Sequence, residues 1–462
     1  MDIRAPVISK VSVDGSVLRS LAARSPDDYP VYFDSAAQGP LAQFSLLALA
    51  PTRSLTRDRQ GKLQAQGVPL VPGGFLDNLQ AWAAREASVP DAAQPHGLPF
   101  GGGWFVYLGY ELAAEIEPRV ALPPADLPFS AFAVRVTDFA VHDLATGAVY
   151  VVSEFDDQAR HQALIERLLA EARQAVPVSR APLSLASQTE DAPERFLAQV
   201  RTALEHIAAG DIYQANLSRA WRLRLARESD AARVYEALRF ANPAPFAARV
   251  SWQGHSILSS SPERLLRITG REISTRPIAG TRPRLVSEQG GAEQDRRDID
   301  ELVQHPKERA EHIMLIDLER NDLGRVCEAG SVTVDEYMVT ESYAHVHHIV
   351  SNVRGRLRAG ATATDALRAL FPGGTITGCP KVRCMQIIAA LEGRGRGAYT
   401  GSLGWLGTNG DADFNILIRT LTQRGADIEL RAGAGIVADS VPERELEETR
   451  AKARGMLRAF TP

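Results

Sequence analysis

Two stretches of the sequence place pairs of glutamates where they could bind one cation together. Glu308 and Glu311 lie in HPKERAEHIMLIDLERND, and Glu445 and Glu448 lie in VPERELEETRAKAR. Residues three positions apart share one face of an α-helix. Two such helices could meet around a hard cation such as Mg²⁺, which prefers oxygen ligands and keeps positions open for a substrate oxyanion.

The alternative is that these glutamates are ordinary solvated side chains, because glutamate is found mostly at protein surfaces. An apolar run at 313–316 closely follows the first pair. It indicates that the first helix is substantially buried, which weakens this alternative. In the second stretch, Lys452 follows Glu448 by one helical turn.

The segment TRPIAGTRPR at 275–284 indicates a pocket for a compact anion. Arginines and prolines bracket Ala279, Gly280 and Thr281. Prolines this close together disfavour a regular helix. Gly280 permits an approach to the backbone that a side chain would block.

The glycine-rich segment FPGGTITGCPK at 371–381 has the glycine interval of a phosphate-binding loop. Cys379 and Pro380 stand where that motif requires Lys and Ser or Thr, so the phosphate-loop hypothesis fails. What remains is a turn before a helix N-terminus. Such a turn suits an anion such as a carboxylate, or it is a plain helix entry.

Three further features extend this anion-binding pattern over the last two-thirds of the chain. Arg419 lies in FNILIRTL, which we expect to be an apolar strand, so its charge requires an anionic partner. The GAGI segment at 433–436 allows a close approach of a ligand to the backbone. Glu263, in SSSPERLL, could donate a proton if it is buried.

The histidines and cysteines indicate structural roles when taken alone. Strand alternation would place His345 and His347 on one face and His348 on the other, and the segment supplies no third metal ligand. Cys379 and Cys384 match neither a CxxC motif nor a zinc knuckle. We therefore expect these cysteines to be packing residues.

The composition is that of an ordinary globular protein. The chain has 462 residues, with 45% hydrophobic and 23% charged residues and a net charge of −4. This mild charge argues against a nucleic-acid or anionic-membrane partner. The few cysteines, and the lack of a signal-type or membrane-spanning apolar run, favour a cytoplasmic protein.

The pattern of expected elements favours an α+β fold with large antiparallel sheets, because strands and helices do not alternate as βαβ units. We expect an N-terminal region at 1–175 and a second region at 190–460, both packed into one globule. The N-terminal region reads as short β-rich pieces with Pro, Gly and Ala turns. The main expected segments are a hairpin strand at 146–155, helices at 156–176, 194–210 and 299–325, a linker at 176–194, and a last helix from Glu443.

Several motifs occur together in the order that is typical of one enzyme family. They are SSSPERLL, TRPIAGTRPR, KERAEHIMLIDLERNDLGRV, FPGGTITGCPKVRCMQII, AYTGSLGWL, FNILIRTL and AGAGIVADSVPERELEETRAKA. In these motifs the chain resembles the chorismate-utilising enzymes over about 195–458, with weaker matches at FDSA and GGWFVYLGYEL. The resemblance implies a sandwich like that of anthranilate synthase component I, with large antiparallel sheets, outer helices and a deep central pocket.

The resemblance also implies roles for individual residues around chorismate. Glu311 and Glu448 match the Mg²⁺ ligands, supported by Glu308 and Glu445, and the Mg²⁺ would hold the ring carboxylate. Glu263 matches the general acid that protonates the departing 4-hydroxyl group. The remaining matches are His348 and Thr375 near the ring, Gly280, Thr281, Gly433 and Gly435 lining the pocket, and Tyr399, Arg419 and Lys452 holding substrate carboxylates.

The nucleophile is indicated by a different position. Water-using members of the family carry a lysine base in the strand that reads DIYQANLSR here, and this chain has Gln214 at that place. Without a base there, activation of water is not favoured. The resemblance thus implies amination, with ammonia from a separate glutamine amidotransferase subunit, since no glutaminase nucleophile motif is evident.

Two branches of the family use ammonia, and the motifs divide between them. Ala279 occupies the place of a lysine nucleophile in many aminodeoxychorismate synthases and resembles the anthranilate synthases. IYQANLS, NPAPF at 242–246 and FDSA resemble the aminodeoxychorismate synthase branch. We therefore expect that branch, in a type that lacks the lysine. Anthranilate synthesis is the alternative, and a non-catalytic binding relative is a more remote one.

Overall fold

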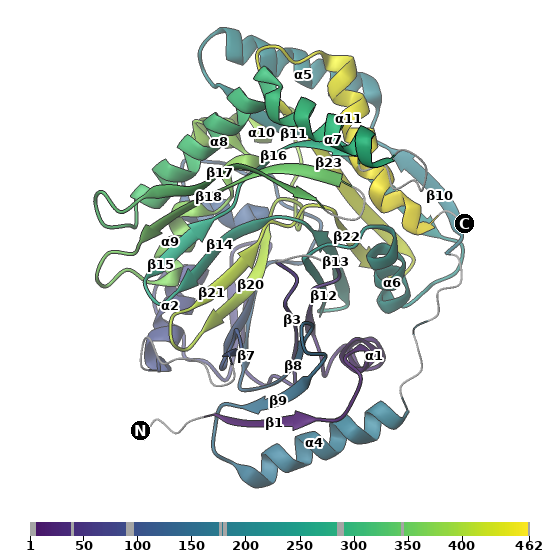
Figure 1. The fold of residues 1–462 in the computed structure, drawn as a ribbon, viewed down its shortest axis with the longest axis vertical. Helices are drawn as coiled ribbons and strands as arrows, with labels where there is room; N and C mark the ends of the chain where they lie inside the picture. The colour runs from purple at the N-terminus through teal and green to yellow at the C-terminus, as the bar shows by residue number, and fades with distance from the viewer. Residues whose placement is uncertain are drawn as a thin grey trace.

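The computed structural model describes residues 6–37, 41–88, 97–174, 178, 183–283, 291–342 and 346–460. Two large sheets form its centre, and every strand pair in them is antiparallel. Helices lie outside the sheets, as Figure 1 shows. The predicted α+β class with large antiparallel sheets is therefore confirmed.

The first sheet has twelve strands among the described residues. Its order is β1 (Val7–Val11), β9 (Val149–Ser153), β8 (Asp138–Asp143), β3 (Phe44–Ala48), β2 (Val31–Asp34), β12 (Phe246–Trp252), β13 (His255–Ser261), β22 (Thr420–Arg424), β23 (Asp427–Ile436), β11 (Gln214–Leu225) and β10 (Leu185–Glu190). The short β19 (Gly378–Cys379) pairs with β11.

The second sheet has eleven strands in the same described ranges. Its order is β16 (Ile278–Pro283), β18 (Val346–Arg356), β15 (Glu272–Thr275), β14 (Arg264–Thr269), β21 (Ala412–Asn415), β20 (Ser402–Gly407), β6 (Gly103–Leu108), β7 (Phe129–Val136), β4 (Ser54–Asp58) and β5 (Leu63–Gln66). Strand β17 (Thr333–Ser342) pairs with β18.

Both sheets combine strands from distant parts of the chain. In the first sheet, Val31 of β2 pairs with Val250 of β12. In the second, Phe105 of β6 pairs with Trp405 of β20. The same mixing occurs in the core, where Phe105 and Val250 are fully buried in one hydrophobic cluster. The two regions of the sequence therefore share their hydrogen-bonded ladders and their core.

The helices cover the outer faces and ends of the sheets. One group gathers over the end that carries β11, β16 and β23 (Figure 1). The helices are α1 (Ser16–Arg24), α2 (Phe75–Arg85), α3 (Ala113–Ile116), α4 (Gln158–Arg173), α5 (Pro193–Ala208), α6 (Ala231–Ala241), α7 (Gly291–Gln304), α8 (Pro306–Gly324), α9 (Ala363–Leu370), α10 (Lys381–Glu392) and α11 (Pro442–Leu457). None of the helices in the described ranges has the length and apolar character needed to span a bilayer.

Local chemistry explains where several of these helices begin and end. Helix α9 begins with a capping box, in which Thr362 accepts from the Asp365 backbone and Asp365 accepts from the Thr362 backbone. Helix α10 ends at Gly393, whose φ of 65° is the left-handed conformation that glycine tolerates best. Helices α5, α8 and α11 each have proline in their first turn.

Several expected elements differ from the structure. The long helix expected at 299–325 is two helices, because Pro306 begins α8 after His305 in an extended conformation. The expected linker at 176–194 contains β10, which pairs with β11. Helices α1, α2 and α6 were not expected, although Asp230 caps α6 at its Ncap position.

Shared sheets predict that neither part of the chain folds alone. Fragments 1–174 and 183–462 would each expose unpaired strand edges and half of the mixed core. We expect neither fragment alone to unfold cooperatively on heating, and we expect the two to co-purify and regain a thermal transition when they are co-expressed. Differential scanning calorimetry measures this, and a cooperative transition in either lone fragment would contradict it.

Candidate active site

Two glycines on one strand form the floor of the candidate site, because neither has a side chain. Gly433 and Gly435 lie two residues apart on β23, which pairs with β11. A β-carbon at Gly433 would lie 2.6 Å from the Tyr399 hydroxyl oxygen. A β-carbon at Gly435 would lie 2.6 Å from Gln214 Nε2 and 3.3 Å from Glu311 Oε1. The glycines therefore leave the room that these side chains use.

The predicted glutamate pairs approach this floor from two helices. Glu311 lies on α8, and its Oε1 accepts a hydrogen bond at 3.4 Å from the side-chain amide of Gln214 on β11. Glu308 lies beside Gly280, since a β-carbon there would be 3.0 Å from Glu308 Oε2. Gly280 has a φ of 71°, which favours glycine.

On α11, Glu448 forms an ion pair with Lys452 at 2.7 Å. The Lys452 ammonium also donates to the Gly433 carbonyl oxygen at 3.0 Å. Glu445, one turn before Glu448, is buried. Glu311 and Glu448 are thus brought to the same stretch of β23.

The donor chemistry of this region fits a hard cation. Carboxylate oxygens are the ligands that Mg²⁺ prefers. In the described ranges, no three Asp, Glu, His or Cys side chains gather closely enough to hold a metal together. In this structure the Glu448 carboxylate is instead paired with Lys452 at 2.7 Å.

Glu263 has the environment of a proton donor near neutral pH. It lies between β13 and β14, and its side chain is only 5% exposed. Burial raises the pKa of Glu263 to about 7, against the opposing effects of the Thr375 hydrogen bond and the Lys452 charge. Thr375 donates to Glu263 Oε1 at 2.8 Å. The sequence indicated the residue but not this pKa.

His348 lies on the second sheet, whereas the glycine floor belongs to the first, and its imidazole is held neutral. On β18, His348 pairs with Thr281 of β16. Burial lowers the pKa of His348 to about 4, the charge of Arg419 lowers it further, and a hydrogen bond with the Gly280 backbone opposes the shift. At pH 7 the imidazole is therefore uncharged.

Arg419 is not in a strand, so that prediction was wrong. It lies in the bend between β21 and β22, with a φ of 52° that a pleated strand cannot accommodate. Its guanidinium donates to Asn242 Oδ1 at 3.2 Å. Burial lowers its pKa below the usual arginine value. The bend places the guanidinium near His348, as the electrostatic effect on that imidazole shows.

Two predicted positions are described only in part, and one lies outside the described residues. The backbones of Ala279 and Thr281 belong to β16, and nothing is described of their side chains. His345 lies outside the described residues. His347 is described, and its ring forms a 2.7 Å hydrogen bond with Ser342.

Asn216 is a site residue that the sequence did not indicate. It lies two residues after Gln214 on β11, and its Oδ1 would be 2.7 Å from a β-carbon at Gly433. The side-chain carbonyl oxygens of Gln214 and Asn216 are both buried without a hydrogen-bond donor among the described residues. The i, i+2 alternation of a strand was the available signal.

A second cavity of about 640 Å³ lies apart from these residues. It is lined by residues of the FDSA and NPAPF motifs, which are more than two hundred positions apart in the sequence. Examples are Asp34, Ser35, Pro245 and Phe246. Residues of FDSA and the last two residues of NPAPF therefore meet around this cavity, whereas IYQANLS contributes Gln214 and Asn216 to the candidate site.

The floor of glycines, the buried acid and the two acidic helices together form the candidate active site. The model of the family described as chorismate binding enzyme matches residues 29–458. The chain therefore belongs to the chorismate-binding enzyme family.

The similar proteins include anthranilate synthases and an aminodeoxychorismate synthase. Anthranilate synthase component 1 of Streptomyces coelicolor is 42% identical over 85% of this chain and 79% of that protein. Aminodeoxychorismate synthase component 1 of Bacillus subtilis is 41% identical over 79% of this chain and 78% of that protein. The crystal structure of anthranilate synthase component I from Streptococcus pneumoniae superposes with a TM-score of 0.79 at 31% identity, covering 91% of this chain and 93% of that one.

The Glu263 environment predicts a carboxyl group that titrates near neutrality. The infrared band of its protonated form should fade as pH rises through about 7, because burial raises its pKa to that value. Thr375→Ala removes a hydrogen bond that favours the charged form, so the band should persist to higher pH.

Glu263→Gln identifies the band by removing it. Thr377→Ala is the matched control, since Thr377 lies two residues away and donates to the Gly373 carbonyl oxygen instead. Equal titration in wild type and Thr375→Ala would contradict the assignment.

Proposed function

We propose that this chain aminates chorismate with ammonia and releases 4-amino-4-deoxychorismate, a precursor of p-aminobenzoate and folate. The observation that carries amination is Gln214, whose amide lies against Glu311 at 3.4 Å. A lysine at this place would supply a base for water, whereas an amide is not basic. Ammonia as the free base needs no such activation.

Three side chains around the Gly433–Gly435 floor supply the binding contacts for a dicarboxylate. Tyr399, Arg419 and Lys452 offer a hydroxyl and two cations for substrate carboxylates. Glu311 and Glu448, supported by Glu308 and Glu445, would hold Mg²⁺ near the Gly433–Gly435 floor. An ion held by these carboxylates would supply positive charge that neutralises the ring carboxylate.

Glu263 supplies the proton for the leaving group. Overall, the C4–O bond breaks, the hydroxyl leaves as water with the Glu263 proton, and the ammonia nitrogen becomes the C4 amino group after losing one proton. A carboxyl with a pKa of about 7 is partly protonated at neutral pH and can donate in this step. The neutral His348 adds no positive charge to those of Arg419 and Lys452.

Gln214 and Asn216 are suited to the incoming nitrogen. Ammonia carries three N–H donors, and these two side chains offer buried carbonyl oxygens without a donor in the described structure. An unpaired buried acceptor is costly, so a donor ligand is favoured there. The relatives are named component 1, which supports a separate glutamine amidotransferase as the source of ammonia.

Anthranilate is the second candidate product. It is favoured by Ala279, since a methyl group cannot attack C2 as a lysine can, and by the Streptomyces coelicolor relative. The FDSA and NPAPF motifs favour C4 amination. In a chain that lacks the lysine, ammonia or water would act at C2, and a second displacement at C4 would give 4-amino-4-deoxychorismate.

The product assay distinguishes these candidates. Purified protein with chorismate, Mg²⁺ and ammonium salt at mildly alkaline pH should yield 4-amino-4-deoxychorismate, trapped as p-aminobenzoate by an added lyase and separated by chromatography. Anthranilate as the product would overturn C4 amination, and isochorismate would overturn the inference from Gln214. No consumption of chorismate would indicate a binding relative. If Ala279→Lys leaves the rate and product unchanged, residue 279 does not select the branch.

Metal dependence follows from the glutamate assignment. Chelation with EDTA should abolish turnover and added Mg²⁺ should restore it. Glu448→Gln should raise the Mg²⁺ concentration for half-maximal rate by about tenfold or more, since loss of even an outer-shell partner costs that much. Glu447→Gln is the matched control, because neighbouring Glu447 pairs with Arg450 at 2.8 Å. Equal Mg²⁺ requirements in the two variants would contradict the assignment.

A further inference from the structure

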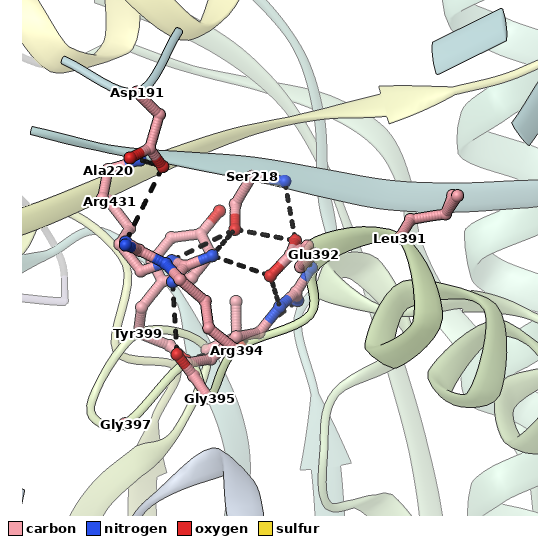
Figure 2. Close-up of polar contacts among 12 residues, drawn as sticks. Asp191, Ser218, Ala220, Leu391, Glu392, Arg394, Gly395, Gly397, Tyr399 and Arg431 are labelled. Carbon is pink, nitrogen blue, oxygen red and sulfur yellow. Dashed lines mark hydrogen bonds and ion pairs between the residues drawn. The ribbon is translucent and has the colours of Figure 1, made fainter. Parts of the chain in front are cut away.

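A buried charge cluster lies behind Tyr399, and no step described above uses it. Glu392, at the end of α10, pairs with Arg396 at 2.6 Å and with Arg431 of β23 at 2.7 Å. The side chains of Glu392, Arg396 and Arg431 are 2%, 1% and 3% exposed. Figure 2 shows Glu392 and Arg431 converging beside Tyr399. This group is called the Glu392 cluster below.

The Glu392 cluster is fully hydrogen-bonded around its carboxylate. The backbone N–H and the hydroxyl of Ser218 both donate to Glu392 Oε1 at 2.9 Å. Arg431 in turn donates to the Ser218 hydroxyl at 2.9 Å. Burial alone would raise the pKa of Glu392, but the two arginines outweigh it and hold the pKa below its usual value. The carboxylate is therefore ionised.

Both arginines lie against the ring of Tyr399. The guanidinium carbons of Arg396 and Arg431 are 5.6 Å and 6.0 Å from the ring centroid. Cations at this distance from an aromatic face attract it. Arg396 also donates to the Asn216 backbone carbonyl at 2.6 Å and to that of Ile376 at 3.2 Å.

The cluster therefore joins β11, β23, the end of α10 and the turn that carries Thr375. A single carboxylate holds the two cations that face the Tyr399 ring. The Tyr399 hydroxyl occupies the space that a side chain at Gly433 would take, since a β-carbon there would lie 2.6 Å from it, and the ring must keep this orientation to hold it there.

We propose that Glu392 is a positioning residue, which orients the Tyr399 hydroxyl toward the substrate carboxylate by fixing Arg396 and Arg431 against the ring. The part of this that concerns the substrate rests on the proposed function. The atoms nearest to a β-carbon at Gly433 belong to Tyr399, Asn216 and Leu217 and not to Glu392, so Glu392 acts through Tyr399. A cluster that serves only the fold would act on stability without acting on this hydroxyl.

A double-mutant cycle tests the proposal. Tyr399→Phe should raise the KM for chorismate about tenfold to a hundredfold, the range for losing a hydrogen bond to a charged group. Glu392→Gln should raise KM in the same direction with a much smaller change in kcat. In the Tyr399→Phe background, Glu392→Gln should change KM by less than about twofold, because the hydroxyl that Glu392 orients is already absent. Equal effects in both backgrounds, or an unchanged KM, would overturn the proposal.

Two further variants separate positioning from stability. Breaking a buried ion pair is strongly destabilising, so Glu392→Gln could also lower stability. Ser218→Ala is a milder change, because it removes one hydrogen bond from Glu392. It should raise KM less than Glu392→Gln does. Glu154→Gln is the matched control, since it breaks the Arg135–Glu154 pair of 2.6 Å in another part of the sheets. It should lower the melting temperature and leave KM unchanged, and a raised KM would overturn the specific role of Glu392.

A measurement without substrate tests the Tyr399 contact independently. Fluorotyrosine-labelled protein is titrated by ¹⁹F NMR, with the Tyr399 signal assigned by its absence in Tyr399→Phe. Burial is the largest cause that raises the pKa of Tyr399, the two arginines lower it, and Glu392 raises it. Because Glu392→Gln removes one charge and frees the two arginines, it should shift the titration of Tyr399, whereas Glu154→Gln should leave that titration unchanged.

An unchanged Tyr399 titration in Glu392→Gln would overturn the proposal. Failure of the wild-type protein to bind or consume chorismate would instead overturn the proposed function, and the NMR titration would still decide whether Glu392 controls Tyr399.

Discussion

The pairing of β11 with β23 is the constraint on which the candidate site depends. Ten registered residue pairs hold these strands together, from Ala215↔Ile436 to Arg224↔Asp427. Within this rigid ladder, Gly433 and Gly435 present bare backbone to the pocket. Tyr399, Gln214 and Glu311 fill the room that two side chains would otherwise take. A β-carbon at either glycine would displace a group to which the site assigns a role.

Burial then sets the charge of the groups above this floor. It makes Glu263 a carboxyl that holds its proton to about pH 7 and keeps His348 neutral. Burial acts in opposite directions on an acid and a base because it disfavours the charged form of each. Lys452 and Arg419 keep their charge beside them. The pocket thus combines a neutral proton donor with fixed cations, as a reaction on an anionic substrate requires.

The sequence was informative where the chemistry is local. The positions of glycine and proline and the strand alternation predicted the fold class and α11. The spacing of the glutamates predicted the acidic faces of α8 and α11. The sequence failed where one residue overrides a pattern, as at Pro306, which divides a helix, and at Arg419, which leaves the strand conformation. Long-range facts, such as the Glu392 cluster or the joint cavity of FDSA and NPAPF, depend on contacts that no spacing encodes.

The floor of the site consists of main chain, and this has a consequence for how such a pocket diversifies. Backbone atoms keep their positions when neighbouring side chains are exchanged, so the Gly433–Gly435 floor keeps its shape whatever side chains surround it. Side chains that surround the floor, such as Gln214 beside Gly435, can then change without altering the floor. A single ancestral pocket of this design could therefore give rise to several products from one shared substrate, each separated from the next by a few substitutions.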